Sequence, residues 1–265
     1  MATAVRARCE SLGIELEGQI ELPGDLDRFE RDLMAGKEAG ATIFRCYCLL
    51  QRRYEHFASR SDWERWQHEA IATLQRVEPI LAKHRVQLAV ENHKDWLAAE
   101  QAAVFQNLSS QWLGVCLDFG NNLALLEDPI AVAKTLSPWI VTTHVKDMGL
   151  RHSPHGFVLS EVPLGQGFLD LPALFRICRT ANPQVRFLLE MITRDPLPVP
   201  CLTDRYWATF APVHQESLQQ SAMEWVARNA TGDALPQESQ LSDAAALALE
   251  QQLVAQSLSF LVPSP

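Results

Sequence analysis

The sequence has no apolar run that approaches the ~20 residues of a membrane span, and its first residues contain no signal-peptide core. It also lacks an internal repeat and a low-complexity tract. The six cysteines have no regular spacing, and no second Cys or His pair accompanies Cys46 and Cys48 at the distance that a zinc ribbon requires. These absences predict a cytoplasmic protein with no membrane partner, whose cysteines are buried free thiols.

Basic charge is scarce as well. The 265 residues include 23 Lys and Arg against 32 Asp and Glu, a formal net charge of −9, and they contain no basic run. Nucleic-acid surfaces need clustered cations, so we expect no nucleic-acid partner. The segment "PLGQG" at residues 163–167 lacks the Lys and Ser or Thr of a phosphate-binding P-loop. It is either a loop that approaches a substrate closely or a plain turn.

The chain alternates strand-like and helical patterns, and its apolar fraction of 47% is enough for a sizeable core. The predicted strands are residues 14–22, 42–49, 87–92, 114–119, 140–146 and 186–191. The predicted helices are residues 26–39, 61–84, 97–109, 129–136 and 171–181. Several strands are apolar on consecutive residues, as expected when both faces are covered. The pattern predicts βα units around a parallel sheet.

We therefore predict an α/β fold, a (β/α)8 TIM barrel over residues 1–200, which is a common architecture at about 250 residues. Six strands are clear and residues 157–161 are a further candidate, one short of eight. The opening "VRARCESLGIELEG" resembles a helix end followed by a second strand, so we expect this chain to lack the first barrel strand. Residues 201–265 are predicted to form a C-terminal extension, packed on the barrel or on a partner subunit, with helices at 216–229 and 242–257.

Four strands end in polar groups that are costly to bury, in "LAVENHKDW", "LGVCLDFGN", "WIVTTHVKDM" and "RFLLEMI". The four polar residues are Glu91, Asp118, His144 and Glu190. Residues two apart share a strand face, so placing these four inward leaves their apolar neighbours facing the helices. Active sites of barrels lie at this carboxyl end of the strands. We expect the four side chains to meet there; the alternative is that they only cap neighbouring helices.

Three carboxylates and one imidazole form an oxygen-rich set of ligands. Without a cation, three converging carboxylates would repel one another strongly. This donor set suits one divalent ion, with Mn²⁺, Mg²⁺ or Co²⁺ preferred over Zn²⁺. The sequence therefore predicts a single metal site formed by these four residues.

The segments "VENHKD", "CLDFGN", "THVKD", "PLGQG" and "LLEM", in this order, resemble the xylose isomerase-like TIM-barrel superfamily. The resemblance points to the branch of sugar phosphate isomerases and epimerases that includes tagatose 3-epimerase and inosose dehydratase, and it covers roughly residues 10–200. It implies one divalent metal bound by the same four residues. It also implies that Glu91 and Glu190 flank the substrate and move its protons.

Two positions depart from the family pattern. Many relatives have a His three residues after the Asp, where this chain has Asn121. An Arg that is often found six residues after the His is replaced by Leu150, with Arg151 beside it. Both changes concern substrate contacts more than the metal. The three-zinc endonuclease IV of the same superfamily needs several additional His ligands, which argues against a nuclease.

Five further residues are candidates for substrate binding: Lys146, His93, Lys94, Asn121 and Arg45. His93 and Lys94 directly follow a strand end and are either substrate contacts or solvated loop residues. Arg45, in "IFRCYC", either binds a substrate oxygen or neutralises a carboxylate inside the barrel. Lys146 shares a strand face with His144, and its alternative role is an ion pair with a nearby aspartate.

The ligand set and the resemblance together predict a metal-dependent sugar isomerase or epimerase. It would act on a ketose or keto-polyol, with proton transfer by Glu91 and Glu190 through an enediolate. The runner-up is a metal-dependent lyase, a dehydratase or decarboxylase of an oxo-sugar or oxo-sugar acid. A further alternative is a non-catalytic barrel that binds a sugar. We expect a small-molecule sugar as the partner, and the sequence also allows a homo-oligomer.

Overall fold

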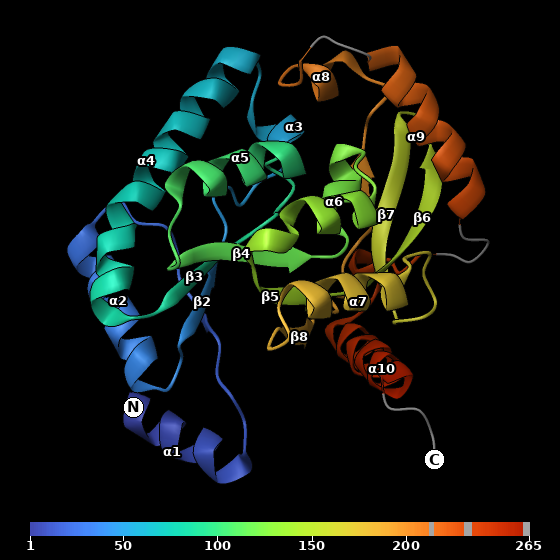
Figure 1. Ribbon diagram of the computed structural model, residues 1–265. Coiled ribbons are helices and arrows are strands. Elements are labelled where there is room, and N and C mark those ends of the chain that lie inside the picture. Colours follow the sequence, from blue (N-terminus) through green and yellow to red (C-terminus); the bar gives the residue numbers. More distant parts are fainter. Residues whose placement is uncertain (212–214, 231–234, 262–265) are drawn as a thin grey trace.

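The computed structural model describes residues 1–211, 215–230 and 235–261, and two sheets organise them (Figure 1). The larger sheet is parallel and has the order β1-β2-β3-β4-β5-β8. Its strands are β1 (Gly18–Gln19), β2 (Ile43–Cys46), β3 (Gln87–Glu91), β4 (Leu113–Asp118), β5 (Ile140–Val145) and β8 (Arg186–Leu189). The smaller sheet is antiparallel, with the order β6-β7-β9. Its strands are β6 (Asp147–Ser153), β7 (Gly156–Val162) and β9 (Leu197–Val199).

Helices follow the strands of the parallel sheet, as the alternating pattern predicts. In the described part of the chain the α-helices are α1 (Ala2–Leu12), α2 (Leu26–Glu38), α3 (Arg53–His56), α4 (Arg60–His84), α5 (Ala98–Leu108), α6 (Pro129–Leu136), α7 (Leu171–Ala181), α8 (Asp204–Trp207), α9 (Gln215–Asn229) and α10 (Asp243–Leu261). Local chemistry sets several helix starts: the side chains of Asp25, Ser59 and Asp128 accept hydrogen bonds from the first turns of α2, α4 and α6. The predicted βα alternation is confirmed.

The core lies between the parallel strands and the helices that cover them. All six residues of β4 are buried, and so are Leu88 and Val90 in β3. Strands of this kind need apolar residues on both faces, which explains their continuous apolar runs. The six parallel strands curl into part of a barrel, with β1 and β8 at the two edges among the described residues (Figure 1). All of their carboxyl ends therefore face the same rim.

The candidate strand at residues 157–161 is real but does not belong to the barrel, so that prediction is wrong. It lies in β7, which pairs antiparallel with β6 (Figure 1). β6 begins only one residue after β5, so one uninterrupted stretch of sequence contains two strands that belong to different sheets. β9 completes this sheet at its edge, where the missing N–H of Pro198 is tolerated. The first predicted strand, at 14–22, is also much shorter than expected, because only Gly18–Gln19 pairs with β2.

The C-terminal helices pack against the second sheet and the loop that follows it. α9 lies against β6 (Figure 1). In α10, the Ser257 hydroxyl accepts a hydrogen bond from the Leu164 amide at 3.3 Å, and the ring of Phe260 lies against Gly165. The predicted helices at 216–229 and 242–257 correspond to α9 and α10. None of the helices that the structure describes combines the length and apolar character needed to cross a bilayer. All six cysteines are free, and Cys46, Cys116, Cys178 and Cys201 are buried.

Candidate metal centre

Strand register brings the four predicted ligands to one rim of the parallel sheet. Glu91 and Asp118 are the last residues of β3 and β4, and His144 is the last but one of β5. Asp118 and His144 are direct neighbours across β4 and β5, so their side chains leave the same face. Glu190 follows β8 immediately, and its amide still donates to the Val145 carbonyl of β5 at 2.9 Å. Backbone pairing at the ends of these strands therefore fixes all four positions.

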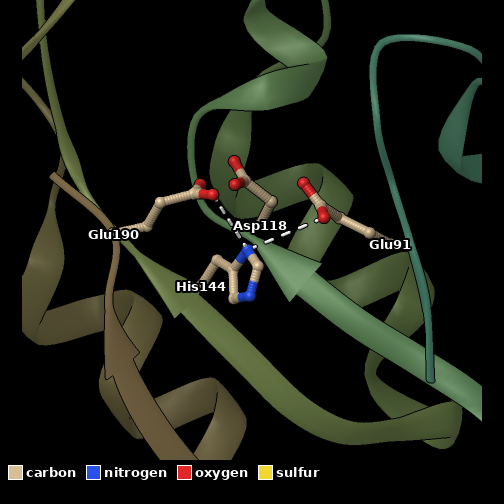
Figure 2. Close-up of side chains that lie close together, drawn as sticks. All are labelled: Glu91, Asp118, His144 and Glu190. Carbon is tan, nitrogen blue, oxygen red and sulfur yellow. Dashed lines mark ion pairs between the residues drawn. The ribbon is translucent and has the colours of Figure 1, made fainter. Parts of the chain in front are cut away.

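The four side chains form one compact cluster, with Glu91 and Glu190 entering from opposite sides (Figure 2). One potential ligand atom from each lies within 4.8 Å of the others. Two donor atoms on opposite sides of an ion at about 2.1 Å are about 4.2 Å apart, so small rotations would close the set around one cation. His144 Nδ1 faces the centre, 3.6 Å from Glu91 Oε2 and 3.4 Å from Glu190 Oε1.

A buried atom in the cluster supports this fit. His144 Nδ1 has no hydrogen-bond partner among the residues that the structure describes, although two carboxylates face it. Asp118 Oδ2 is contacted by the Lys146 ammonium at 2.8 Å. Buried polar atoms rarely remain unsatisfied, and such atoms are often explained by an ion. Three carboxylates with one imidazole are ligands for a hard or borderline divalent cation. The residues present therefore fit a single metal ion, which they would bind through these four side chains.

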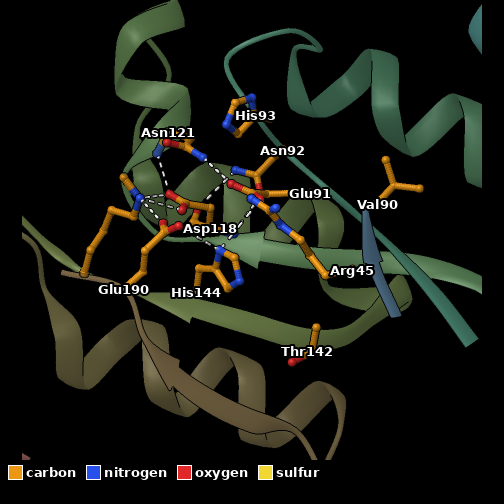
Figure 3. Close-up of polar contacts among 12 residues, drawn as sticks. Arg45, Val90, Glu91, Asn92, His93, Asp118, Asn121, Thr142, His144 and Glu190 are labelled. Carbon is orange, nitrogen blue, oxygen red and sulfur yellow. Dashed lines mark hydrogen bonds and ion pairs between the residues drawn. The ribbon is translucent and has the colours of Figure 1, made fainter. Parts of the chain in front are cut away.

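Glu91 is held by two neighbours that the sequence offered as substrate contacts (Figure 3). Arg45 donates to Glu91 Oε2 through Nε at 2.5 Å and through its Nη2 group. Asn121 Nδ2 donates to Oε1 at 2.7 Å. Arg45 pairs in register with Ala89, which shares a strand face with Glu91, so the arginine points inward. Of the two roles considered for Arg45, the structure places it in the second, beside a carboxylate inside the barrel.

Asp118 is fixed by the backbone around it. Its Oδ1 accepts from the amides of Gly120 and Asn121 at 2.9 and 2.8 Å, and its own amide donates to Asn92 Oδ1 at 2.7 Å. These bonds leave Oδ2 directed into the cluster. Burial raises the pKa of Asp118, and the charge of Lys146 opposes that rise.

Lys146 lies in the cluster itself. Its ammonium is 2.8 Å from Asp118 Oδ2, contacts Glu190 Oε2, and is 3.6 Å from Glu161 Oε1. The side chain is only 2% exposed. Burial works against its charge, but the surrounding carboxylates raise the pKa of Lys146 above its usual range. Lys146 thus forms an ion pair with Asp118, as the alternative interpretation held, and it also contacts the proposed catalytic residue Glu190.

Glu190 and His144 adjust each other's protonation. Burial acts to raise the pKa of Glu190, but the His144 imidazole and the Lys146 ammonium outweigh it and lower that pKa below the ordinary value. Burial disfavours the imidazolium of His144, yet Glu190 and Glu91 raise the pKa of His144. Glu190 is therefore held as a carboxylate. Its side chain is 20% exposed, against 1% for Glu91.

The structure gives the side chains of His93 and Lys94 different environments. The His93 ring stacks on Tyr47 and its Nδ1 lies 3.0 Å from the Leu49 carbonyl, so it packs beside the cluster rather than joining it. Burial, with the charge of Lys94, lowers the pKa of His93 to about 4. Lys94 is 7% exposed, so it is not a solvated loop residue. Burial and the charge of Lys146 lower the pKa of Lys94 to about 8.

The "PLGQG" loop is held by the carboxylate of Asp147. Asp147 Oδ2 accepts from the amides of Gly165 and Gly167 at 2.9 and 3.0 Å, and Asp147 Oδ1 accepts from the Leu169 amide at 3.1 Å. A Cβ atom at Gly167 would lie 2.1 Å from Asp147 Oδ1. The glycines allow this close approach to a buried carboxylate, and the loop amides are occupied by it.

The sequence patterns did not identify three residues that lie near the cluster. Asn92 bonds to the Asp118 amide and carbonyl and so positions the end of β4. Glu161, in β7, is 2% exposed and contacts both Lys146 and Arg194. A carboxylate inside the apolar run "FVLSEV" is a signal that could have identified Glu161. Arg194 lies in irregular chain between β8 and β9, where no periodic signal exists.

Comparison with known proteins identifies a family that matches most of the chain. Residues 19–228 match the family model described as "Xylose isomerase-like TIM barrel". Among curated proteins, the chain is similar to a 3-oxo-isoapionate decarboxylase from Pectobacterium atrosepticum, with 32% identity over 126 residues. The matched segment covers 47% of this chain and 46% of that protein, so it spans about half the length of that relative.

Solved structures show the same fold. A D-psicose 3-epimerase in the presence of D-fructose has a TM-score of 0.58 and 15% identity, over 86% of this chain and 83% of that one. A xylose isomerase-like TIM barrel protein from Mycobacterium smegmatis in complex with magnesium has a TM-score of 0.54 and 16% identity, over 83% and 76%. The IOLI protein with a binding zinc atom has a TM-score of 0.55 and 15% identity, over 84% and 81%.

Proposed function

The chain belongs to the xylose isomerase-like TIM barrel family, and we propose that it is a divalent-metal-dependent isomerase or epimerase of a ketose or keto-polyol. The observation that carries this proposal is the placement of two carboxyl groups, those of Glu91 and Glu190, on opposite sides of one compact ligand cluster. Such a pair suits a reaction in which one group removes a proton and the other returns it. The similar fold of a D-psicose 3-epimerase supports the same reaction class.

Glu91, Asp118, His144 and Glu190 would hold the ion. When bound, a divalent ion polarises a substrate carbonyl and acidifies the neighbouring C–H group. The oxygen-rich donor set favours Mg²⁺, Mn²⁺ or Co²⁺ over Zn²⁺. Magnesium and zinc are each present in one similar structure, so the comparisons support both a hard and a borderline ion.

The protein's own residues then handle protons and charge. One glutamate takes the proton from the carbon beside the carbonyl, and the C–H electron pair forms the C=C bond of an enediolate while the carbonyl oxygen gains the charge. The other glutamate, after taking up a proton from solvent, gives that proton to carbon, which yields the epimer or the isomer. The first glutamate then releases its proton to solvent. Arg45 pairs with Glu91, and Lys146 pairs with Glu190. His144 and Lys146 lower the pKa of Glu190, which makes it a weaker base, so activation of the substrate must compensate.

Solvent exchange tests this assignment. The manganese-loaded protein would be incubated in D₂O with a panel of ketoses, and one substrate C–H signal should disappear from the proton NMR spectrum as product forms. Metal-free protein should neither form product nor exchange the C–H proton. Glu64→Gln, on the exposed face of α4, serves as the control variant and should behave like the unmodified protein. Conversion by the metal-free protein would contradict the proposal.

A second candidate is a metal-dependent lyase, in particular a decarboxylase of an oxo-sugar acid. It is favoured by the pairing of both glutamates with buried cations, because decarboxylation needs no strong base. The bond to the carboxylate breaks, CO₂ leaves, and the electron pair stays on the substrate as an enolate that is later protonated. The name of the similar curated decarboxylase supports this candidate. Release of ¹³CO₂ from a carboxyl-labelled oxo-sugar acid would distinguish it from the isomerase.

A further inference from the structure

One buried cation beside the cluster lacks an anion. Lys94 as a residue is 7% exposed, and among the described residues its ammonium forms no hydrogen bond or ion pair, although the atom itself still reaches solvent. The backbone at Lys94 has a φ of 67°, and its carbonyl accepts from the Arg53 amide at 3.0 Å, so the position is held by the fold. An unpartnered buried charge is costly, and it indicates a ligand of opposite charge.

Lys94 lies three residues after Glu91, beyond the carboxyl end of β3, so the chain itself places it at the rim where the cluster lies. Lys146 and Arg194 repel its charge, while Asp118 and Glu91 attract it. Both of these carboxylates are proposed metal ligands, so a bound ion would take up their charge. In the metal-loaded protein, Lys94 would therefore face mainly other cations, and the need for an anion would increase.

Arg194 supplies a second donor. Its Nε donates to Glu161 Oε2 at 3.2 Å and its Nη2 contacts Glu161 Oε1, which orients the guanidinium. Nη1 contacts no acceptor in the part of the chain that the structure describes, and the side chain is 39% exposed. Arg194 also feels the charges of Glu190 and Asp118, so it lies at the same rim. One edge of its fork is fixed, and Nη1 remains free for a ligand.

The charge balance points in the same direction. Lys94, Lys146 and Arg194 are matched by the carboxylates of Asp118, Glu161 and Glu190, and Arg45 is matched by Glu91. A divalent ion would leave this set of groups with an excess of two positive charges. A substrate with one carboxylate would halve this excess, and a neutral ketose would leave it unchanged.

We propose that Lys94 and Arg194 form an anion subsite beside the metal, which binds the carboxylate of a sugar acid. This rests on the proposed function, since it assumes that the ion and the reacting carbonyl lie at the four-residue cluster. It applies to both candidate reactions, and for the isomerase it narrows the substrate from a neutral ketose to a keto-sugar acid. A carboxylate is favoured over a phosphate because the nearby glycine-loop amides that could cradle a phosphate are already bonded to Asp147. One lysine and one arginine edge suffice for a carboxylate.

Binding of unreactive probes tests the subsite. The manganese-loaded protein would be titrated with erythronate, erythritol and erythritol 4-phosphate, which lack a carbonyl group and cannot react. Erythronate should bind at least about tenfold more tightly than erythritol. Lys94→Met and Arg194→Met should each weaken erythronate binding by about ten- to a hundredfold, while erythritol affinity and metal content stay unchanged. Arg151→Met, exposed on β6, is the matched control.

Several results would overturn the subsite. One is equal binding of erythronate and erythritol by the unmodified protein, and another is a preference that both variants retain, because the probe carboxylate would then contact the metal instead. If the two substitutions weaken binding of erythritol 4-phosphate but not of erythronate, the subsite binds a phosphate and not a carboxylate. Arg194→Met changes a partly exposed residue, so the test does not depend on folding of the Lys94 variant. Solvent exchange with ketoses is measured separately, so failure of the subsite is distinguishable from failure of the proposed function.

Discussion

The two glutamates at either end of the cluster are held in different ways. Glu91 ends a regular strand, is 1% exposed, and is bound by Arg45 on one oxygen and Asn121 on the other. Glu190 lies just beyond a short strand, is 20% exposed, and contacts Lys146 and His144. Both carry a buried countercharge, but only Glu190 is reachable from outside. If both glutamates hold the ion as proposed, Glu91 would be the anchored ligand, and Glu190 would combine ligation with access to substrate.

Removing each base in turn breaks this comparison most strongly. Glu91→Gln and Glu190→Gln each keep an oxygen ligand but lose the base, so turnover at saturating metal should fall by roughly 10² to 10⁴. An isomerase that uses both groups predicts a large loss in both variants. The measurement is the rate of product formation and of C–H exchange, with Glu64→Gln as the control. Near-normal turnover in both Gln variants would contradict the acid/base assignment.

Removing the cation that pairs with each glutamate shows how much each ion pair contributes to the stability of the protein. Lys146→Met leaves Asp118 and Glu190 without their buried cation, and Arg45→Met does the same to Glu91. Breaking a buried ion pair costs about 3–5 kcal/mol, so the metal-free variants should unfold at lower urea concentration. The loss for Lys146→Met should be the larger, because Lys146 serves more carboxylates.

Added Mn²⁺ sharpens this second test. The ion should recover much of the lost stability in Lys146→Met, because it would neutralise the same carboxylates. The exposed Lys83→Met is the control. If the loss is the same with and without Mn²⁺, the ion does not sit among these groups. Kinetically, Lys146→Met should raise KM or lower kcat with its metal content unchanged.

Asp95 lies in the loop after Glu91, and we expect it to make the free energy of unfolding depend on pH. Burial raises the pKa of Asp95 to about 7, and its Oδ2 has no hydrogen-bond partner among the described residues. The folded protein binds this proton more tightly than the unfolded chain does. The destabilisation is therefore absent below about pH 4 and grows until the pH has passed about 7.

Denaturation with urea at several pH values measures this effect. Between pH 5 and 8, Asp95 should lower the free energy of unfolding by about 2–3 kcal/mol. Asp95→Asn keeps an acceptor for the amides of His93 and Trp96 and should remove that part of the slope. The exposed Asp32→Asn should not change it. An unchanged slope in Asp95→Asn would show that the carboxyl is already ionised at pH 5.

The smallest expected effect concerns Asn121. Its amide donates to Glu91 Oε1, and Asn121→Ala removes that bond while leaving the Arg45 contact intact. Groups that orient a metal ligand are worth about 10- to 100-fold in metal affinity, and the remaining arginine favours the lower value. Titration with Mn²⁺ should show about tenfold weaker binding. An unchanged affinity would mean that Arg45 alone positions Glu91.

How much of this site could be predicted depended on regular pairing. Alternation along β3, β4 and β5 was enough to place Glu91, Asp118 and His144 on one face, because the register shift between Val115 and Cys116 comes before the paired residues Asp118 and His144. The direction of Arg45 stayed open until the register of β2 against β3 was known. The second sheet was missed because β6 follows β5 after one residue. Arg194 stands in irregular chain, where position depends on tertiary contacts alone.

The roles of these residues remain a prediction, and the central claim is that one divalent ion binds at the four of them. The most direct measurement is the anomalous diffraction of crystals of the manganese-loaded protein. The account predicts a single peak per chain, about 2.0 to 2.3 Å from one donor atom each of Glu91, Asp118, His144 and Glu190. Three peaks, or a peak elsewhere with these side chains still bound only to Arg45 and Lys146, would contradict it.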